Sequence, residues 1–445
     1  MKRTAKIMTA AALLGGIVAS GERAEAGGFW LPARGARSLA MGGATVAGAV
    51  DGSAMWDNPA NLAAFDGSRL TVDLGLIQRG TSFQREGSSI ETNNSAAPQV
   101  DPSVFFTTDL GTKNFTFGVG VWAPYLSPTT FDENADTRYQ LVSSTGSIML
   151  YQGLGVAWQP SKYFRIGAVL ENMTVKVRFI KMASAYTGFI AQPESKDWDM
   201  LVKMEGTKAV NISGAFGLWL KLGKLPIEIG ASTQLPIDLN FDGTMEARLP
   251  SSVFFDNAKA NGNSAKFDMS MPWITRVGLR VAQEKWDVEA AYKYERWRTI
   301  QNLAILPDIV VTGLPAMEEQ RIHPINVPKY FRDAHSFHLG GSFRIGEKVR
   351  MRAGYFFERG AVPPQTLSLE NADMNKHGFS LGASVAVGSW EIDMAYAHIA
   401  MQTTTVQDSL VTQQNPVNEG GASTVGNGTF TGSYNIFGVG FSKKF

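Results

Sequence analysis

The chain has 445 residues, a formal net charge of +1 and no cysteine. Disulfides, catalytic thiolates and zinc–thiolate sites are therefore excluded, and 41 basic against 40 acidic residues leave no cationic surplus for nucleic acid. Beyond the amino-terminal apolar run, no stretch is long enough to cross a bilayer as a helix, which excludes a helical membrane protein.

The first 26 residues have the layout of a secretory signal peptide. Three basic residues precede an apolar run over residues 7–19, and Ala24 and Ala26 form a small-x-small cleavage pattern. The run is too short and too glycine-interrupted for a transmembrane anchor. We expect cleavage after Ala26, so that the mature chain begins at Gly27.

Residues 27–67 are rich in glycine and alanine and show no strand alternation. A disordered leader would have this glycine content, but it would lack the many large apolar side chains that this segment carries. The sequence therefore predicts a packed segment with room for short helices. Its large apolar residues are Phe29, Trp30, Leu31, Leu39, Met41, Met55, Trp56, Leu62 and Phe65.

From residue 68 to the end, apolar and polar residues alternate in long runs. One such run places Trp286, Val288 and Tyr292 on one face and Asp287 and Glu289 on the other, which is typical of a β-strand. Many runs reach 11 to 15 residues, which suits a tilted strand that crosses a bilayer better than a soluble sandwich. We expect about fourteen strands, near 68–80, 100–110, 114–124, 146–158, 163–180, 206–220, 225–248, 264–282, 285–303, 334–345, 348–359, 375–387, 389–402 and 432–445.

The connections between these runs alternate between short and long, as in bacterial outer-membrane barrels. The last run ends with Phe437, Val439, Phe441 and terminal Phe445 on one face. An ordinary amphipathic edge strand would also show this pattern, but barrel closure would remove its exposed edge. The predicted fold is an all-β transmembrane antiparallel barrel, with residues 1–26 as signal peptide, 27–67 as a plug inside the lumen and 68–445 as barrel.

Several segments carry a resemblance to a known family. Residues 27–67, with Asn58-Pro59-Ala60 before the first strand, resemble the amino-terminal hatch of the FadL/TodX family of long-chain fatty acid and aromatic hydrocarbon transporters. Further similar stretches are GVGVWAPYL at 118–126, PWITRVGLRV at 272–281, WDVEAAYKYERW at 286–297, DAHSFHLGGSFRI at 333–345 and MRAGYFFERGAVP at 351–363. The resemblance implies a fourteen-stranded barrel with a hatch, a hydrophobic groove among the outer loops, a deeper apolar pocket and a side opening. Apart from this resemblance, a last strand that stops on the aromatic Phe445 looks like the signal that the outer-membrane assembly machinery reads, so we expect that partner.

The resemblance suggests where a ligand would bind. Phe29 and Trp30 match the amino-terminal tip that reaches the deep pocket, although they could equally anchor the hatch to the wall. Aromatic residues on the predicted outer loops are the other ligand-binding candidates, and contact with lipid or another copy is the alternative for them. These loop candidates are Phe189, Trp198, Phe254 and Phe255.

The third predicted strand resembles the family strand that opens the wall. Gly118 and Gly120 weaken that strand and Pro124 cannot donate to its ladder, so we expect a lateral opening there. The alternative for the two glycines is that they make room for the hatch.

Charged residues on the predicted inward faces, such as Arg276, Lys293 and Asp393, favour a network that pairs with Arg34, Arg37 and Asp57 of the hatch. The sequence does not select the Arg or Lys that would receive a substrate carboxylate. The five histidines lie near no nucleophile motif and no cluster with metal-ligand spacing. We therefore expect no enzyme activity, no catalytic or metal site and no cofactor.

The resulting interpretation is a monomeric outer-membrane transport protein for hydrophobic small molecules such as long-chain fatty acids. Its substrate would diffuse through a hatch-plugged barrel and leave laterally into the membrane lipid. A general porin and a surface receptor or adhesin barrel remain alternatives at this point.

Overall fold

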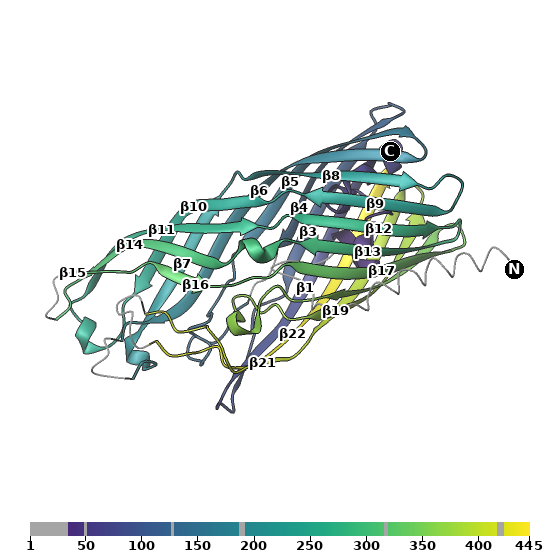
Figure 1. Cartoon of the computed structure of the whole chain (residues 1–445). Coiled ribbons are helices and arrows are strands. Elements are labelled where there is room, and N and C mark those ends of the chain that lie inside the picture. The colour runs from purple at the N-terminus through teal and green to yellow at the C-terminus, as the bar shows by residue number, and fades with distance from the viewer. Residues whose placement is uncertain (1–33, 49–50, 126–128, 187–191, 316–318, 416–421) are drawn as a thin grey trace.

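The computed structural model describes residues 34–48, 51–125, 129–186, 192–315, 319–415 and 422–445. These residues form one long antiparallel barrel, in which strands run side by side along the length of the molecule (Figure 1). The barrel closes where β1 pairs with β22 over seventeen residue pairs, from Arg69↔Lys444 to Arg85↔Gly428. The predicted all-β barrel of fourteen strands is confirmed.

Ten of the barrel strands are continuous in the described part of the chain. They are β1 (Ser68–Arg85), β3 (Gln99–Thr108), β4 (Phe115–Tyr125), β5 (Ile148–Ser161), β6 (Phe164–Ser184), β17 (Ala334–Ile345), β18 (Val349–Glu358), β19 (Lys376–Val387), β20 (Trp390–Met401) and β22 (Gly428–Lys444).

The other four barrel strands each consist of two segments that pair with the same neighbours in succession. They are β7 (Asp199–Lys208) with β8 (Ile212–Lys221), β9 (Ile227–Gln234) with β10 (Ile237–Arg248), β11 (Lys259–Met271) with β12 (Ile274–Ala282), and β13 (Trp286–Glu295) with β14 (Asn302–Thr312). Pro236 and Pro272 stand at two of the interruptions, where the missing N–H cannot join the ladder. The remaining short strands are β2 (Glu91–Asn93), β15 (Glu319–Arg321), β16 (Ile325–Pro328) and β21 (Thr404–Val406).

The strands alternate in burial because one face meets the lumen and the other meets lipid. In β19, Ser380 is buried and the flanking Phe379 and Leu381 are 56% and 65% exposed. Large exposed apolar side chains occur on the outward face of strand after strand around the wall. Such a surface is unfavourable in water and favourable in a bilayer.

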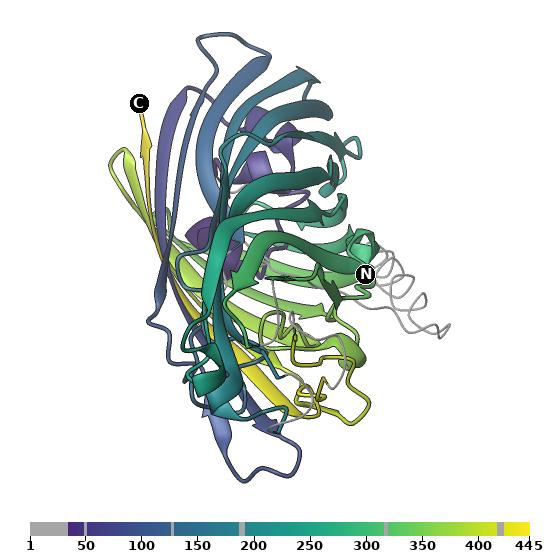
Figure 2. The ribbon, with the colours of Figure 1, turned by 90° about the vertical axis from the view of Figure 1, so that its left-hand side faces the viewer.

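The segment before β1 lies inside the barrel. Its helices are α2 (Gly35–Ala40), α3 (Ala54–Asp57) and the 3-10 helix η2 (Pro59–Ala64), and most of its described side chains are buried. These purple helices lie in the half of the molecule where the carboxyl terminus is labelled, enclosed by strands in both views (Figures 1 and 2). We call residues 34–48 and 51–67 the hatch.

The two ends of the barrel differ. Tight turns such as Gly346–Lys348 join strands at the hatch end, and long loops follow the strands at the other end. Those loops contain the 3-10 helices η3 (Lys196–Trp198), η4 (Val253–Phe255), η5 (Trp297–Thr299) and η6 (Pro364–Thr366). No helix in the described ranges is long and apolar enough to cross a membrane.

Candidate functional site

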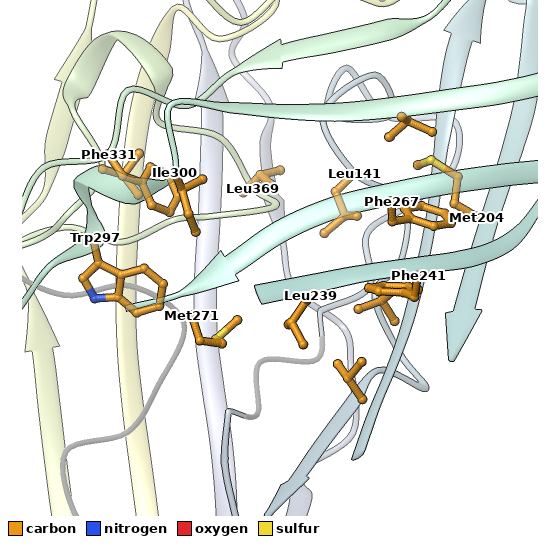
Figure 3. Close-up of a cluster of buried hydrophobic side chains, with 14 of the residues drawn as sticks. Leu141, Met204, Leu239, Phe241, Phe267, Met271, Trp297, Ile300, Phe331 and Leu369 are labelled. Carbon is orange, nitrogen blue, oxygen red and sulfur yellow. The ribbon is translucent and has the colours of Figure 1, made fainter. Parts of the chain in front are cut away.

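An apolar cavity lies inside the outer half of the barrel. Thirteen of its nineteen lining residues are apolar, and strands β5, β6, β7, β10, β11 and β14 supply most of them. Figure 3 labels five of these side chains within a cluster of buried hydrophobic residues. They are Met204, Phe241, Phe267, Ile300 and Phe331.

Two stacked phenyl rings form part of the cavity wall. The rings of Phe241 on β10 and Phe267 on β11 are 5.3 Å apart with an interplanar angle of 18°. Gly206 and Gly243 make room for them, because a Cβ there would lie 2.4 Å from Phe241 and 2.6 Å from Phe267 respectively. Large apolar side chains opposite small ones therefore shape this part of the cavity.

One end of the cavity is charged. Glu370 accepts a hydrogen bond from Lys181 Nζ at 3.1 Å and from Lys329 Nζ at 2.9 Å. With its side-chain amide in the orientation that satisfies its neighbours, Asn371 also accepts from Lys329 at 2.7 Å. The two lysine side chains are 6% and 4% exposed. This cluster of Lys181, Lys329 and Glu370 is called the lysine pair with its glutamate below.

The two lysines lower the pKa of Glu370 by more than burial raises it. Burial by itself would raise the pKa of Glu370, but the two ammonium groups lower that pKa to about 2. Glu370 is therefore ionised at neutral pH. Among the described residues that line the cavity, two cations face one anion, so the charged end carries one positive charge in excess.

A second, smaller cavity lies on the other side of the same cluster. Its lining includes Lys181, Lys329 and Glu370 together with polar residues of the long loops, such as Gln140 and Gln414. The lysine pair with its glutamate therefore stands between an apolar cavity and a polar one.

The hatch is held to the barrel wall by charge-assisted contacts. Glu289 on β13 accepts hydrogen bonds from the backbone N–H groups of Val46, Ala47 and Gly48 at 2.6, 2.8 and 2.7 Å. Arg37 pairs with Asp393 and Glu391 on β20, each at 2.9 Å. This arrangement agrees with the expected network between inward charges and the hatch.

The Asn58-Pro59-Ala60 turn is fitted into a notch in the wall. The Asn58 amide donates to Val46 O at 2.8 Å and to Leu218 O at 3.0 Å, and its oxygen accepts from Ala60 N. A Cβ on Gly217 would lie 2.0 Å from the Asn58 oxygen, and one on Gly167 would lie 2.4 Å from the Pro59 backbone. These wall glycines allow the hatch backbone to approach directly.

Strand pairing in the wall is interrupted between the outer parts of β3 and β4. β3 and β4 pair only from Val104↔Val121 to Thr108↔Phe117, although β3 continues to Gln99 along β1. Beyond Val121, the consecutive residues Trp122, Ala123 and Pro124 are all buried, and the register with β5 shifts between Trp122 and Tyr125. Burial of three successive residues means that β4 bends into the lumen there. We call this unpaired stretch, residues 99–103 against 122–125, the seam.

The three residues predicted for the lateral opening do not all lie at the seam. Pro124 lies at the seam. Gly118 and Gly120 lie just below it in the paired ladder, opposite Thr107 and Phe105. A Cβ on Gly118 would meet Met55 of the hatch at 3.1 Å, and one on Gly120 would meet Phe105 at 2.5 Å, which favours the alternative that these glycines make room. Their role in an opening stays a prediction.

The predicted ligand-binding residues fall into two groups. Phe29, Trp30 and Phe189 lie outside the described residues. Trp198, Phe254 and Phe255 pack on one another, with ring centroids 5.2 to 5.5 Å apart, in the loop region beside the cavity lining. Their part in ligand binding stays a prediction.

The cluster of Lys181, Lys329 and Glu370 was not predicted from the sequence. Lys181 ends an alternating run, on the same face as Val177 and Phe179, and this inward charge was a usable signal. Lys329 and Glu370 lie on two different loops and are 41 residues apart in the chain, and no spacing rule brings them together.

A lipid-facing barrel of fourteen strands, with a segment inside it and an apolar cavity near its outer end, defines a transport protein of the outer membrane. The family model described as outer membrane protein transport protein (OMPP1/FadL/TodX) matches residues 17–445, and the chain belongs to this family. Fold and family are those of transport proteins.

Relatives agree with this assignment. A putative outer membrane protein of Neisseria meningitidis is 20% identical, covering 97% of this chain and 98% of its own length. Outer membrane protein P1 of Haemophilus influenzae is 21% identical over 71% of this chain and 69% of its own. Among solved structures, a FadL homologue of Pseudomonas aeruginosa superposes with a TM-score of 0.78 at 14% identity, covering 94% of this chain and all of that one. The toluene transporter TodX of Pseudomonas putida gives 0.68 at 16% identity, covering 93% and 99%.

Proposed function

We propose that this protein carries hydrophobic acids, molecules with a long apolar chain and one carboxylate, from the outside into the outer membrane by diffusion. The observation that supports this substrate class is the lysine pair with its glutamate at the end of the apolar cavity. The apolar chain would occupy the space between Met204, Phe241 and Phe267, and the carboxylate would lie at Lys181 and Lys329.

Charge balance favours an acid over a neutral hydrocarbon. Two buried lysines with one glutamate leave one positive charge in excess, and a buried charge is stable only when it is paired. A bound carboxylate would bring the site to neutrality. A neutral ligand such as an alkane would leave the excess charge in place.

The remaining route is part of the proposal. The aromatic cluster of Trp198, Phe254 and Phe255 would offer the first apolar contact on the loops, and Phe29 and Trp30 stay candidates for contact with the ligand. The hatch would block the direct path to the periplasm. Exit through the seam suits an apolar chain, because transfer into water would cost about 0.8 kcal/mol for each CH₂ group exposed.

The substrate class can be tested by comparing two ligands that differ only in the head group. Dodecanoate and dodecanol would be titrated into the purified protein in detergent, with calorimetry as the measurement. We expect Lys329→Met to weaken dodecanoate binding roughly tenfold or more, as for the loss of one charge-assisted hydrogen bond, and to leave dodecanol binding unchanged.

A matched control and a second variant make the result interpretable. Lys203→Met removes a lysine on β7 that is 30% exposed and pairs with Glu205 and Glu246, and it should leave both affinities unchanged. Lys329→Arg keeps the cation and should retain most of the dodecanoate affinity. Equal weakening of both ligands by Lys329→Met would mean that the lysine is only structural, and the acid would then not be the preferred substrate.

A further inference from the structure

Within the described residues, no ladder pair joins β3 to β4 along the seam. Across it, β3 carries Pro102 and β4 carries Pro124, neither of which has an N–H for the ladder. Farther out, contact resumes where Ser95 N donates to Thr130 O at 2.8 Å. Because unpaired backbone groups are unfavourable at membrane depth, the two edges need another connection.

One side chain of the hatch reaches both edges. Arg34 Nη2 donates to Pro124 O on β4 at 2.8 Å, and Arg34 Nη1 lies 3.5 Å from Asp101 Oδ2 on β3. The Arg34 side chain is 1% exposed, and that of Asp101 is 15% exposed. The planar guanidinium fork allows two partners in different directions to be bound at once, which a lysine cannot do in the same geometry.

The helix that follows Arg34 is bonded to the barrel wall. Arg34 directly precedes α2, and within α2 the Ala36 N–H donates to Asp73 Oδ1 on β1 at 2.9 Å. The next turn is held by the pairing of Arg37 with Asp393. The guanidinium therefore extends from an anchored helix, and its position follows that of the hatch.

The structure also provides space beside the contact. A small cavity is lined by Asp101, Gly75, Leu39 and other residues of α2, β1 and β22. Gly75 is the β1 residue directly opposite Asp101, and it contributes no side chain to this space. The Asp101 carboxylate has room to turn away once Arg34 leaves it.

We propose that Arg34 is a clasp that holds the seam closed and links its opening to movement of the hatch. This inference rests on the proposed lateral exit for its role in transport, but not for its geometry. Arg34 is a positioning residue, since it acts on the two strand edges. Withdrawal of the hatch end would release β3 from β4 and open the wall at the place where β4 already bends inward.

If Arg34 merely anchored the hatch, its loss would have a different effect from the loss of a clasp. Ser103 and Thr107 both lie on the inward face of β3 and are 5% and 1% exposed. Ser103 is at the seam, whereas Thr107 is in the paired ladder opposite Gly118. Loss of a clasp would expose only the first position, whereas loosening of the whole hatch would expose both.

Thiol labelling measures this difference. The chain has no cysteine, so Ser103→Cys or Thr107→Cys is the sole thiol in each protein. The full chain would be reconstituted in phosphatidylcholine vesicles and labelled with N-ethylmaleimide, with and without Arg34→Met. We expect Arg34→Met to raise the labelling rate at Ser103→Cys roughly tenfold, as for the loss of one charge-assisted hydrogen bond, and to leave Thr107→Cys unchanged.

Further variants keep the test decisive. Asp101→Asn removes the ion pair at β3 and leaves the bond to Pro124, so it should raise the Ser103→Cys rate less than Arg34→Met does; it carries the test if Arg34→Met does not fold. Arg34→Lys should give an intermediate rate. An unchanged rate at Ser103→Cys in folded protein, or equal increases at both thiols, would overturn the clasp.

Uptake of dodecanoate by cells that express these variants separates the two proposals. Selective labelling at Ser103→Cys together with unchanged uptake would support the clasp and refute exit through the seam. Selective labelling together with faster uptake would support both.

Discussion

At the scale of single residues, the lysine pair with its glutamate combines a structural role with the binding role that we propose for it. Glu370 stabilises two ammonium groups that would otherwise be buried without a counter-charge, and its carboxylate occupies one of the positions from which a ligand acid could be bound. Glu370 lies on a long loop and forms ion pairs with Lys181 on β6 and with Lys329 before β17. Its charge therefore also holds this loop against the cavity.

Removal of this charge should have a pH-dependent effect. The pKa of Glu370 is lowered to about 2, below its ordinary value, so its contribution to stability is complete above about pH 5 and is lost as pH falls toward 2. Glu370→Gln should lower the free energy of unfolding by about 3 kcal/mol at pH 7, and the difference from wild type should vanish near pH 2. Guanidinium unfolding at several pH values measures both.

The control for this prediction is Glu246→Gln. Glu246 is 61% exposed and its contact with Lys203 is long, so its replacement should change stability by less than about 0.5 kcal/mol. A destabilisation by Glu370→Gln that stayed constant from pH 7 to pH 2 would contradict the ion-pair explanation.

At the scale of elements, the hatch and the wall are fitted backbone to backbone. Wall glycines admit the Asn58-Pro59-Ala60 turn, and the same rule applies at Gly230, where a Cβ would lie 2.2 Å from Val46 O. The contact is therefore intolerant of even one added methyl group, since no flexible side chain can move to accept it.

Gly217→Ala should displace the turn from its notch. The new Cβ would lie 2.0 Å from the Asn58 oxygen and 2.7 Å from Ala60 N, so we expect a loss of about 3 kcal/mol or more from the docking of the hatch. Hydrogen exchange at residues 58–62, followed by mass spectrometry, should become markedly faster. Gly214→Ala on the same strand, which would meet only Val169 O at 3.0 Å, is the matched control and should leave this exchange slow.

At the scale of the whole molecule, the extent of strand pairing varies around the barrel wall. Closure between β1 and β22 uses seventeen residue pairs, whereas β3 and β4 share five. The barrel therefore closes without the hatch. The hatch is needed to fill the lumen, because fourteen strands enclose more space than wall side chains alone can fill.

Deletion of residues 27–67 should leave a barrel that inserts into membranes and conducts ions. The strands and the carboxyl-terminal Phe445, the expected assembly signal, are unchanged in this variant, while the charged contacts of Glu289 and Asp393 lose their hatch partners. Planar-bilayer conductance is the measurement, with the intact protein as the low-conductance reference. Equal conductance of the intact and deleted proteins, both folded, would mean that the segment is not a plug, and high conductance of both would favour a general porin.

The sequence by itself determined the class of fold. Period-two alternation follows directly from the geometry of a strand with lipid on one side, so fourteen runs and their alternating connections could be read without knowing any contact. The sequence also predicted that inward charges such as Asp393 would meet hatch arginines such as Arg37, because this inference concerns one strand face. A weak point in the wall at Pro124 was predicted from the resemblance to the family strand together with the missing proline N–H.

Tertiary structure decided which residues meet across the lumen. Lys329 and Glu370 lie on loops whose paths no periodicity describes, and Lys181 joins them only because the barrel brings its strand opposite those loops. The division between Pro124 at the seam and Gly118 and Gly120 below it depends on register with β3, which one strand cannot reveal. Arg34 became a candidate clasp for the same physical reason: its partners are a side chain on one strand and a carbonyl on another, and backbone carbonyls have no sequence signature.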